Sequence, residues 1–357
     1  MKRLGLSGDT MKLNLDFYKN KTVLVTGHTG FKGTWLTKIL LSVGAKVIGY
    51  SLLPNTKPNI FTLSKVEKDI THIIGDITDY DNLNSVFKKY KPEIVFHLAA
   101  QPLVLEGYKN PRYTYNTNIM GTVNLLECVK NCKSVKTVIN ITTDKVYQNN
   151  EKGQPFVETD VLNGIDPYSN SKSCSELITE CYYKSFLKEN GVTVVTMRAG
   201  NVIGGGDFSE NRIMPDCVKA AQSGKSIIIR NPNSVRPFQH VLDPLFAYLL
   251  VGSQKFDDIK HFNVGPSELD CITTEELAKK FCKFWGDAKY IISSNNNAPH
   301  EAGLLLLNCS KIHKELGWNP VWNIDTAIKK VCEFHKNKNV VKIMDKQIEE
   351  YIMAIKK

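Results

Sequence analysis

The stretch Thr22-Val23-Leu24-Val25-Thr26-Gly27-His28-Thr29-Gly30-Phe31-Lys32-Gly33 decides the fold of this 357-residue chain. Its first residues form a short apolar run, which predicts a buried strand. The glycines that follow allow a tight turn and a close backbone approach to a phosphate. A segment with apolar residues at helical spacing comes next, and Ala45 to Tyr50 returns as a second strand. Strand, glycine turn, helix and strand predict the opening unit of an α/β fold with a Rossmann-type, doubly wound parallel sheet.

Composition narrows the class of protein. With 42% hydrophobic residues the chain can bury a full core. No apolar run reaches the roughly 18 residues of a membrane span, and the N-terminus lacks the apolar core of a signal peptide. The nine cysteines form no paired C-x-x-C motif, and no histidine stands beside them at the spacing of metal ligands. We therefore expect a cytoplasmic protein with reduced thiols, no membrane anchor and no metal site.

The net charge of +10 does not by itself indicate a nucleic-acid partner. The lysines are dispersed among acidic residues, and no basic run of five or more exists. A nucleic-acid footprint needs the charge on one face. A lysine-rich solvated surface is the expected reading, and a site for an anionic small molecule is compatible with it.

The end of the second strand indicates which dinucleotide the glycine turn would bind. The acidic residue that usually holds the adenosine ribose is absent, and Tyr50-Ser51-Leu52 stands there instead. No residue from 49 to 55 is basic, as NADP would require, so NAD is the expected cofactor. Asp76, at the mouth of a third strand from Ile73 to Ile77, either receives the adenine amino group or caps a turn. His97 lies inside the apolar run from Ile94 to Gln101, the fourth strand, and is expected in the core.

Two groups of reactive side chains follow. Thr142-Thr143-Asp144-Lys145 comes directly after the apolar run Val138 to Ile141, so it should lie at a strand's carboxyl end, where α/β sheets bind ligands. Tyr168 and Lys172 open a predicted helix that ends near Glu189 and lie one turn apart on the same face. A lysine cation within reach of a phenol lowers its pKa from about 10, which predicts a usable base.

These motifs, in this order, resemble the extended short-chain dehydrogenase/reductase family. Within it the chain is similar to the CDP-glucose 4,6-dehydratases, from Lys21 to Trp322. The matching segments are Gly27 to Gly33, His97 to Val104, Thr143 to Lys145, Arg198 to Asp207 and Arg236 to Val241.

The resemblance implies a lyase that oxidises a nucleotide sugar at C4 with NAD, eliminates water across C5 and C6, and returns the hydride to C6. Tyr168 would take the C4 hydroxyl proton, Lys172 would hold the nicotinamide ribose, and Thr143 would bind the C4 oxygen. Asp144 would protonate the leaving C6 hydroxyl. Lys145 would be the C5 base if neighbouring charge keeps it neutral, or would only orient Asp144.

The expected contacts are numerous. For the cofactor they are Gly27, His28, Thr29, Gly30, Phe31, Lys32, Gly33, Tyr50, Asp76, Ile77, Leu98, Ala99, Ala100, Gln101, Asn118, Thr142, Tyr168 and Lys172. For the nucleotide sugar, with CDP-glucose favoured, they are Gln101, Asn201, Arg212, Arg230, Arg236 and His240. Arginine forks match diphosphate oxygens, although for Arg230 a surface ion pair is an equal alternative.

The expected domains are a Rossmann domain with the catalytic residues (17–200) and a smaller α/β substrate domain (201–335) that returns one strand or helix to the sheet near 236–265. A helical tail (336–357) follows, and the residues before Phe17 are expected to form a loose leader. A homodimer, or a dimer of dimers, is expected through the helices at 118–130 and 168–189.

The chain also departs from the family pattern. Leu105 replaces an arginine and Gly107 a serine, and both lie near the expected sugar pocket. Further changes fall at 148–152 and at Gly303, Leu306 and Asn308. Two other functions therefore stay open: another nucleotide-sugar enzyme of this fold, such as an epimerase or a dehydratase for a different sugar, and a non-catalytic NAD-binding scaffold. Asp144 argues against the epimerase, which has no hydroxyl to expel, and the complete Tyr168, Lys172 and Asp144 set argues against the scaffold.

Overall fold

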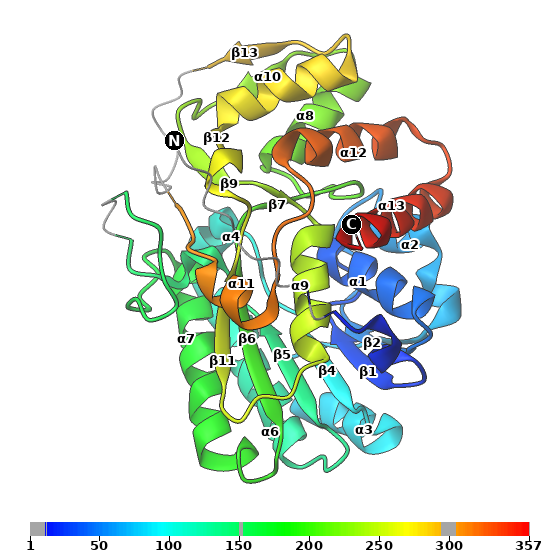
Figure 1. Ribbon diagram of the computed structural model, residues 1–357, viewed down its shortest axis with the longest axis vertical. Coiled ribbons are helices and arrows are strands. Elements are labelled where there is room, and N and C mark those ends of the chain that lie inside the picture. The colour runs from blue at the N-terminus through cyan, green and yellow to red at the C-terminus, as the bar shows by residue number, and fades with distance from the viewer. Residues whose placement is uncertain (1–10, 12, 150–152, 294–304, 357) are drawn as a thin grey trace.

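The computed structural model describes residues 11, 13–149, 153–293 and 305–356. A seven-stranded sheet runs through the larger part of the molecule (Figure 1), with the strand order β11-β6-β5-β4-β1-β2-β3 and parallel pairing throughout. Its strands are β1 (Thr22–Thr26), β2 (Lys46–Ser51), β3 (Thr71–Ile74), β4 (Ile94–His97), β5 (Thr137–Ile141), β6 (Thr193–Ala199) and β11 (Lys260–Val264). The order reverses between β1 and β4, and such a switch point opens a crevice at the carboxyl ends of the strands.

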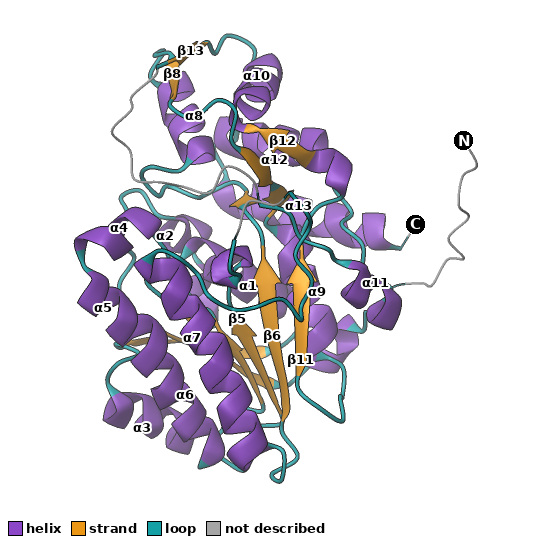
Figure 2. Cartoon of the chain, turned by 90° about the vertical axis from the view of Figure 1, so that its left-hand side faces the viewer, coloured by secondary structure: helices purple, strands orange, loops and turns teal. Residues whose placement is uncertain are grey.

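Helices cover both faces of this sheet, as the side view in Figure 2 shows. One core lies under α1 (Phe31–Ser42), α9 (Leu242–Gly252), α11 (Ser310–Leu316) and α13 (Val340–Ile355). The other lies under α3 (Tyr80–Tyr90), α6 (Gly121–Lys130), and α7 (Pro167–Tyr182) with its continuation, the π turn Tyr183–Leu187. The sheet is buried on both sides, and this explains its nearly continuous apolar strands.

Local sequence fixes the two elements that carry the site. Gly27 has a φ of +74°, and a Cβ on Gly33 would lie 2.1 Å from the Gly27 carbonyl oxygen, so glycine is required both in the turn before α1 and in the first turn of that helix. Asp166 caps α7 by accepting a hydrogen bond from Ser169 N at 3.0 Å, and Pro167 occupies the first helical position.

The smaller lobe has its own apolar core. The chain enters it after β6 through β7 (Val202–Ile203) and leaves through β10 (Gln239–His240), which pairs with β7 in parallel. Its other elements are α8 (Ile213–Gln222), β8 (Ile227–Ile229), β9 (Val235–Pro237), β12 (Cys271–Thr273), α10 (Thr274–Trp285), β13 (Tyr290–Ile292) and α12 (Ile324–Lys336). Short helices α2 (Ile60–Ser64), α4 (Val104–Lys109) and α5 (Pro111–Tyr115) complete the larger part.

Several sequence-based boundaries were wrong. The third strand ends at Ile74, before Asp76, and the fourth ends at His97 rather than Gln101. The helix expected from Asn118 begins as a π turn, Asn116–Met120, and becomes α6 at Gly121. The expected leader is also wrong in part, since Met11, Leu13 and Leu15 pack against the core. Among the described residues, none of the helices combines the length and the apolar character that a membrane crossing needs.

Candidate active site

The reactive segment lies at the carboxyl end of β5, where the chain turns into a short 3-10 helix, Asp144–Val146. The Thr143 hydroxyl donates to Asp144 Oδ1 at 2.9 Å, and Lys145 Nζ donates to the same oxygen at 3.1 Å and to Asn201 Oδ1 at 3.2 Å. Asp144 is 1% exposed, and its Oδ2 has no hydrogen-bond partner within the described part of the chain. The segment thus presents a buried carboxyl group with one oxygen free to exchange a proton.

Tyr168 lies beside this segment at the start of α7. The pKa of its phenol is raised to about 12: burial and the charges of Asp144 and Asp166 raise it, and a hydrogen bond with Thr143 and the charge of Arg212 lower it. The expectation that Lys172 lowers this pKa was wrong, because Lys172 Nζ donates instead to the Ile141 carbonyl at 3.0 Å. Thr143 and Arg212 are the groups that favour the phenolate.

Lys172 is 5% exposed, one helical turn after Tyr168. Burial lowers the pKa of its ammonium group to about 8, and the carboxylate of Glu176 opposes that shift. The lysine is therefore a buried cation near neutral pH.

The glycine turn contributes a third lysine to the same cluster. The pKa of Lys32, the second residue of α1, is lowered to about 7. Burial is the largest cause, the charges of Arg212, Lys172 and Lys145 act in the same direction, and Asp144 opposes them. The cofactor turn and both reactive segments therefore meet around Lys32, on which the charges of Asp144, Lys145, Lys172 and Arg212 all act.

The glycine turn packs closely against the chain that follows β4. A Cβ on Gly27 would lie 2.7 Å from Ala99 N, so the turn packs against the segment after β4, where Leu98, Ala99 and Ala100 are partly exposed. A glycine backbone, the amino end of α1 and small residues after β4 suit a dinucleotide diphosphate. The residues present fit the cofactor that the sequence predicts.

Three expected cofactor contacts are corrected because their side chains point into the core. His28 Nε2 bonds to His72 Nδ1 at 2.7 Å beneath Gly49. Tyr50 is fully buried and donates to the Asp76 carbonyl at 2.8 Å. Thr142 donates to Glu176 Oε1 at 2.5 Å.

Four further positions have structural partners. Asp76 Oδ1 accepts from the backbone and hydroxyl of Thr78, which is the turn-capping alternative. Ile77 is buried against Gly121. Gln101 N donates to Asn118 Oδ1 at 2.8 Å, and Asn118 Nδ2 donates to Gln101 O and to Ser171 Oγ. These amides tie the segment after β4 to α7. His97 is buried as expected and bonds to Thr26 Oγ1 at 2.8 Å.

The substrate-side residues separate into two groups. Asn201 and Arg212 join the reactive cluster, and Arg212 Nη1 is held by Asp207 Oδ2 at 3.2 Å. Arg236 is 6% exposed and donates to the Val235 carbonyl, while Arg230 is exposed and acts on the charge of Asp216. His240 is corrected, because it is fully buried between the rings of Trp35 and Trp322.

Glu176 and Arg198 were missed as site residues by the sequence reasoning. Both are almost fully buried and ion-paired at 2.9 Å directly behind the cluster. A signal existed in the sequence. Glu176 stands four residues after Lys172 on the same helix face, and Arg198 interrupts the apolar strand Val194 to Ala199. A charged residue inside such a run needs a buried partner.

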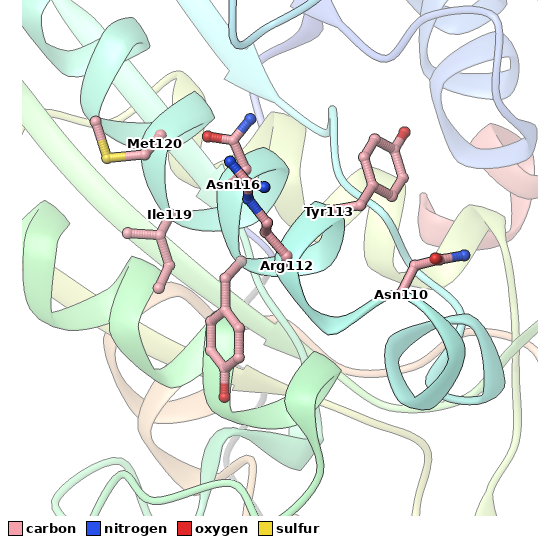
Figure 3. A pocket seen from close by; sticks show the side chains of 7 residues that line it. Asn110, Arg112, Tyr113, Asn116, Ile119 and Met120 are labelled. Atoms are coloured by element: carbon pink, nitrogen blue, oxygen red, sulfur yellow. The ribbon is translucent and has the colours of Figure 1, made fainter.

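A recess elsewhere on the surface is separate from this site. Figure 3 shows it on α5 and the following π turn, lined by Asn110, Arg112, Tyr113, Tyr115, Asn116, Ile119 and Met120. The hydroxyl of Tyr115 donates to Asn170 Oδ1 on α7 at 3.2 Å. No catalytic residue expected from the sequence lines this recess.

The structure locates most of the residues at which the chain departs from the family pattern. A Cβ on Gly107 would lie 3.1 Å from Tyr168 N, so α4 packs directly on the start of α7. Leu105 is partly buried on the same helix, and Gln148 is exposed. Leu306 O accepts from Phe156 N, and Asn308 Oδ1 accepts from Ser310 N. Residues 150–152 and Gly303 lie outside the described residues.

Known proteins resemble this chain along most of its length. Residues 24–331 match the family model described as GDP-mannose 4,6 dehydratase. The CDP-glucose 4,6-dehydratase of Salmonella typhimurium is 41% identical over 355 residues, which cover 96% of this chain and 99% of that protein. The dTDP-glucose 4,6-dehydratase of Haemophilus influenzae is 27% identical, over 88% and 97% of the two chains.

Solved structures share the fold. A UDP-glucose 4-epimerase of Thermotoga maritima with UDP-glucose has a TM-score of 0.79 at 25% identity, covering 88% of this chain and 98% of that one. A dTDP-glucose 4,6-dehydratase of Bacillus anthracis in complex with NAD has a TM-score of 0.75 at 24% identity, covering 91% and 99%.

Proposed function

Because the chain belongs to the GDP-mannose 4,6-dehydratase family, we propose that it is an NAD-dependent nucleotide-sugar 4,6-dehydratase acting on CDP-glucose. One observation carries the proposal: Asp144, buried and with a free oxygen, lies in one cluster with Thr143, Tyr168 and Lys172. The Salmonella relative is a CDP-glucose 4,6-dehydratase, and it supports this choice of substrate.

The cluster can divide the reaction between its residues. Tyr168 accepts the proton of the C4 hydroxyl, and Thr143, bonded to the phenol, binds the C4 oxygen. Asp144 gives a proton to the leaving C6 hydroxyl through the oxygen that has no partner in the described part of the chain. The glycine turn and Lys172 would hold NAD, which would supply an acceptor for the C4 hydride and a donor of hydride to C6. Lys145, whose Nζ lies beside Asp144 Oδ1 and Asn201 Oδ1, takes the proton lost from C5 as Asp144 gives its proton to the leaving hydroxyl.

The cofactor and the nucleotide have separate binding groups. The glycine turn before α1 and the partly exposed residues after β4 fit NAD, and Lys172 supplies a buried cation for its ribose. The NAD complex of the Bacillus dehydratase supports the same cofactor. Arg212, held by Asp207, is the arginine nearest the cluster and binds the diphosphate of the sugar.

An epimerase is the second candidate, because the Thermotoga epimerase has the same fold. Epimerisation needs no acid for a leaving hydroxyl. The carboxyl group of Asp144 inside the cluster therefore favours dehydration.

We also infer a homodimer. Apolar side chains are exposed on α5, the π turn, α7 and its continuation, where Tyr113, Met120, Leu177 and Phe186 are each more than 40% exposed. This is the face that carries the recess in Figure 3. Light scattering of the purified protein tests the dimer.

All nine cysteines, each within the described ranges, are unpaired, which supports a reducing, cytoplasmic location.

Mass spectrometry of the nucleotide sugar tests the activity. The protein is incubated with NAD and CDP-glucose in deuterated water, in parallel with the GDP-, dTDP- and UDP-glucoses. We expect loss of water and one deuterium at C5, with CDP-glucose turned over fastest. Inversion at C4, seen by NMR of the recovered nucleotide sugar, without loss of water and without deuterium at C5 would establish the epimerase instead. The Asp81→Asn variant, at an exposed position on α3, is the matched control for Asp144→Asn.

A further inference from the structure

We propose that Glu176 and Arg198 are positioning residues that hold the reactive segment and Lys172 in register, a role that rests on the proposed function. Neither residue belongs to the cluster around Asp144. Both lie one layer below it, where α7 packs against β5 and β6.

Glu176 joins the helix to two strands. It is 1% exposed and stands one turn after Lys172. Its Oε1 accepts from the Thr142 hydroxyl at 2.5 Å, and its Oε2 accepts from the Thr196 hydroxyl at 2.6 Å and from Arg198 Nη2 at 2.9 Å. A carboxylate with both oxygens bonded fixes the rotation of α7, and with it the direction of Lys172.

Arg198 extends this network to the other side of the reactive segment. Its Nη1 donates at 2.9 Å to the Tyr147 hydroxyl and to the Glu158 carbonyl, and Tyr147 donates in turn to Asn263 Oδ1 at 2.6 Å. Thr142 directly precedes the Thr143 to Lys145 segment and Tyr147 follows it closely. The buried pair therefore anchors the segment at both ends.

Glu176 is also the anion that acts on Lys172. The other titratable groups facing Lys172 are Tyr168 on the same helix, His97 from β4 and Lys32 from α1. None of these supplies a negative charge near neutral pH. Glu176 raises the pKa of Lys172 against the larger effect of burial, which brings it to about 8.

The groups facing Glu176 are cationic or neutral. Arg198 comes from β6, His261 Nδ1 from β11 lies 3.3 Å from Oε2, and Tyr147 lies beyond Arg198. Burial opposes its ionisation, but Arg198 and the hydrogen bond from His261 hold the pKa of Glu176 well below its usual range. Glu176 is thus charged wherever Lys172 titrates.

The test is the pH dependence of NAD binding, measured by protein fluorescence from pH 6 to 10 with the full chain. Wild-type affinity should fall as pH rises through about 8, when Lys172 loses its proton. In Glu176→Gln, which keeps an acceptor for Thr142, the midpoint should move down by about one pH unit or more. At pH 8, kcat for CDP-glucose should fall about fivefold with little change in KM, since a pKa lowered from about 8 to about 7 reduces the protonated fraction from about one half to about one tenth.

The control is Glu180→Gln, one turn further along the same helix, where Glu180 pairs with Lys184 at the surface. Its midpoint should equal that of the wild type. If Glu176→Gln does not fold, the double variant Glu176→Gln/Arg198→Met removes both buried charges and should show the same downward shift. An unchanged midpoint in a folded variant, whatever its stability, would overturn the positioning role.

NAD binding also separates this inference from the proposed function. A shifted midpoint in a protein that does not dehydrate CDP-glucose would sustain the role of Glu176 and reject the substrate. Dehydration of CDP-glucose with an unshifted midpoint would sustain the substrate and reject the role of Glu176.

Discussion

Two neighbouring clusters of buried polar groups have opposite constructions. In the cluster that contains Lys32 and Asp144, the cations Lys32, Lys145, Lys172 and Arg212 outnumber the carboxylates, and one oxygen of Asp144 has no partner in the described part of the chain. Behind it, both oxygens of Glu176 are bonded, and Arg198 pairs with one of them. Burial costs a charge its hydration, and the second cluster recovers that cost through direct pairing. The first leaves charge and hydrogen-bonding capacity available for a ligand.

This difference separates residues that serve the reaction from residues that serve the fold. A change in the first cluster should lower activity with little loss of stability. A change in the second should lower stability, and affect activity through the position of Lys172.

The largest expected effect is on activity. Tyr168→Phe should lower kcat about 10³-fold, because the group that accepts the C4 hydroxyl proton is gone. The free energy of unfolding should stay within about 0.5 kcal/mol, since only a hydroxyl is removed. Steady-state kinetics and chemical denaturation measure the two quantities. A variant that unfolds as it loses activity would break the distinction between the clusters.

Arg198→Met should, in contrast to Tyr168→Phe, lower the stability of the fold strongly. It leaves Glu176 buried without its cation, which costs about 3–5 kcal/mol of unfolding free energy. Denaturation by urea, against Arg230→Met at an exposed position, makes the comparison. A loss below about 1 kcal/mol would mean that the pair contributes nothing to the fold.

A third buried carboxyl group shows what happens without a cation. Asp243 on α9 is fully buried and accepts from Val321 N, Trp322 N and the Tyr351 hydroxyl of α13. Burial raises its pKa to about 7, although these hydrogen bonds lower it. Neutral donors thus offset less of the burial cost than a guanidinium does.

Linkage gives this carboxyl group a pH signature. Its folded pKa lies above its unfolded value, so its stabilising contribution is complete below about pH 4 and is lost as pH rises through about 7. Relative to Asp243→Asn, the wild type should lose about 2–4 kcal/mol between pH 4 and pH 8. Thermal unfolding of both proteins across this range measures the difference. Parallel stability curves would contradict the raised pKa.

The smallest expected effects are those of substitutions at two adjacent threonines. Thr142 donates to Glu176 in the second cluster, whereas Thr143 donates to Asp144 in the first. Thr142→Val should cost about 1–2 kcal/mol of stability, because it leaves a buried acceptor with fewer donors. Thr143→Val should lower kcat with a smaller loss of stability. Equal losses of stability in the two variants would show that Thr142 and Thr143 do not belong to different clusters.

The fold could be predicted because its signals are local. The glycine turn, the apolar strands and the caps each act over a few residues, and the sheet order follows from the parallel unit that they define. Errors occurred where neighbouring elements decide the outcome. The π turn before Gly121 and the early end of the third strand depend on packing that no short window of sequence contains.

The reactive side chains could be predicted from short motifs, and Asn201 and Arg212 from the resemblance to the family. Thr143, Asp144 and Lys145 lie together, as do Tyr168 and Lys172. The side chains of His28, Tyr50 and His240 were misplaced, since each is drawn into the core by a distant ring or carbonyl group. Glu176 and Arg198 are 22 residues apart in the sequence, and their hydrogen-bonded ion pair is seen only in the folded chain.

The most direct test is a single turnover of Asp144→Asn with stoichiometric CDP-glucose and NAD, followed by the absorbance of reduced nicotinamide and by mass spectrometry. If Asp144 acts only in the elimination of water, the variant should oxidise the sugar, accumulate reduced cofactor and form no dehydrated product. The wild type should return the hydride and leave little reduced cofactor. Dehydrated product formed by Asp144→Asn at close to the wild-type rate would contradict the account.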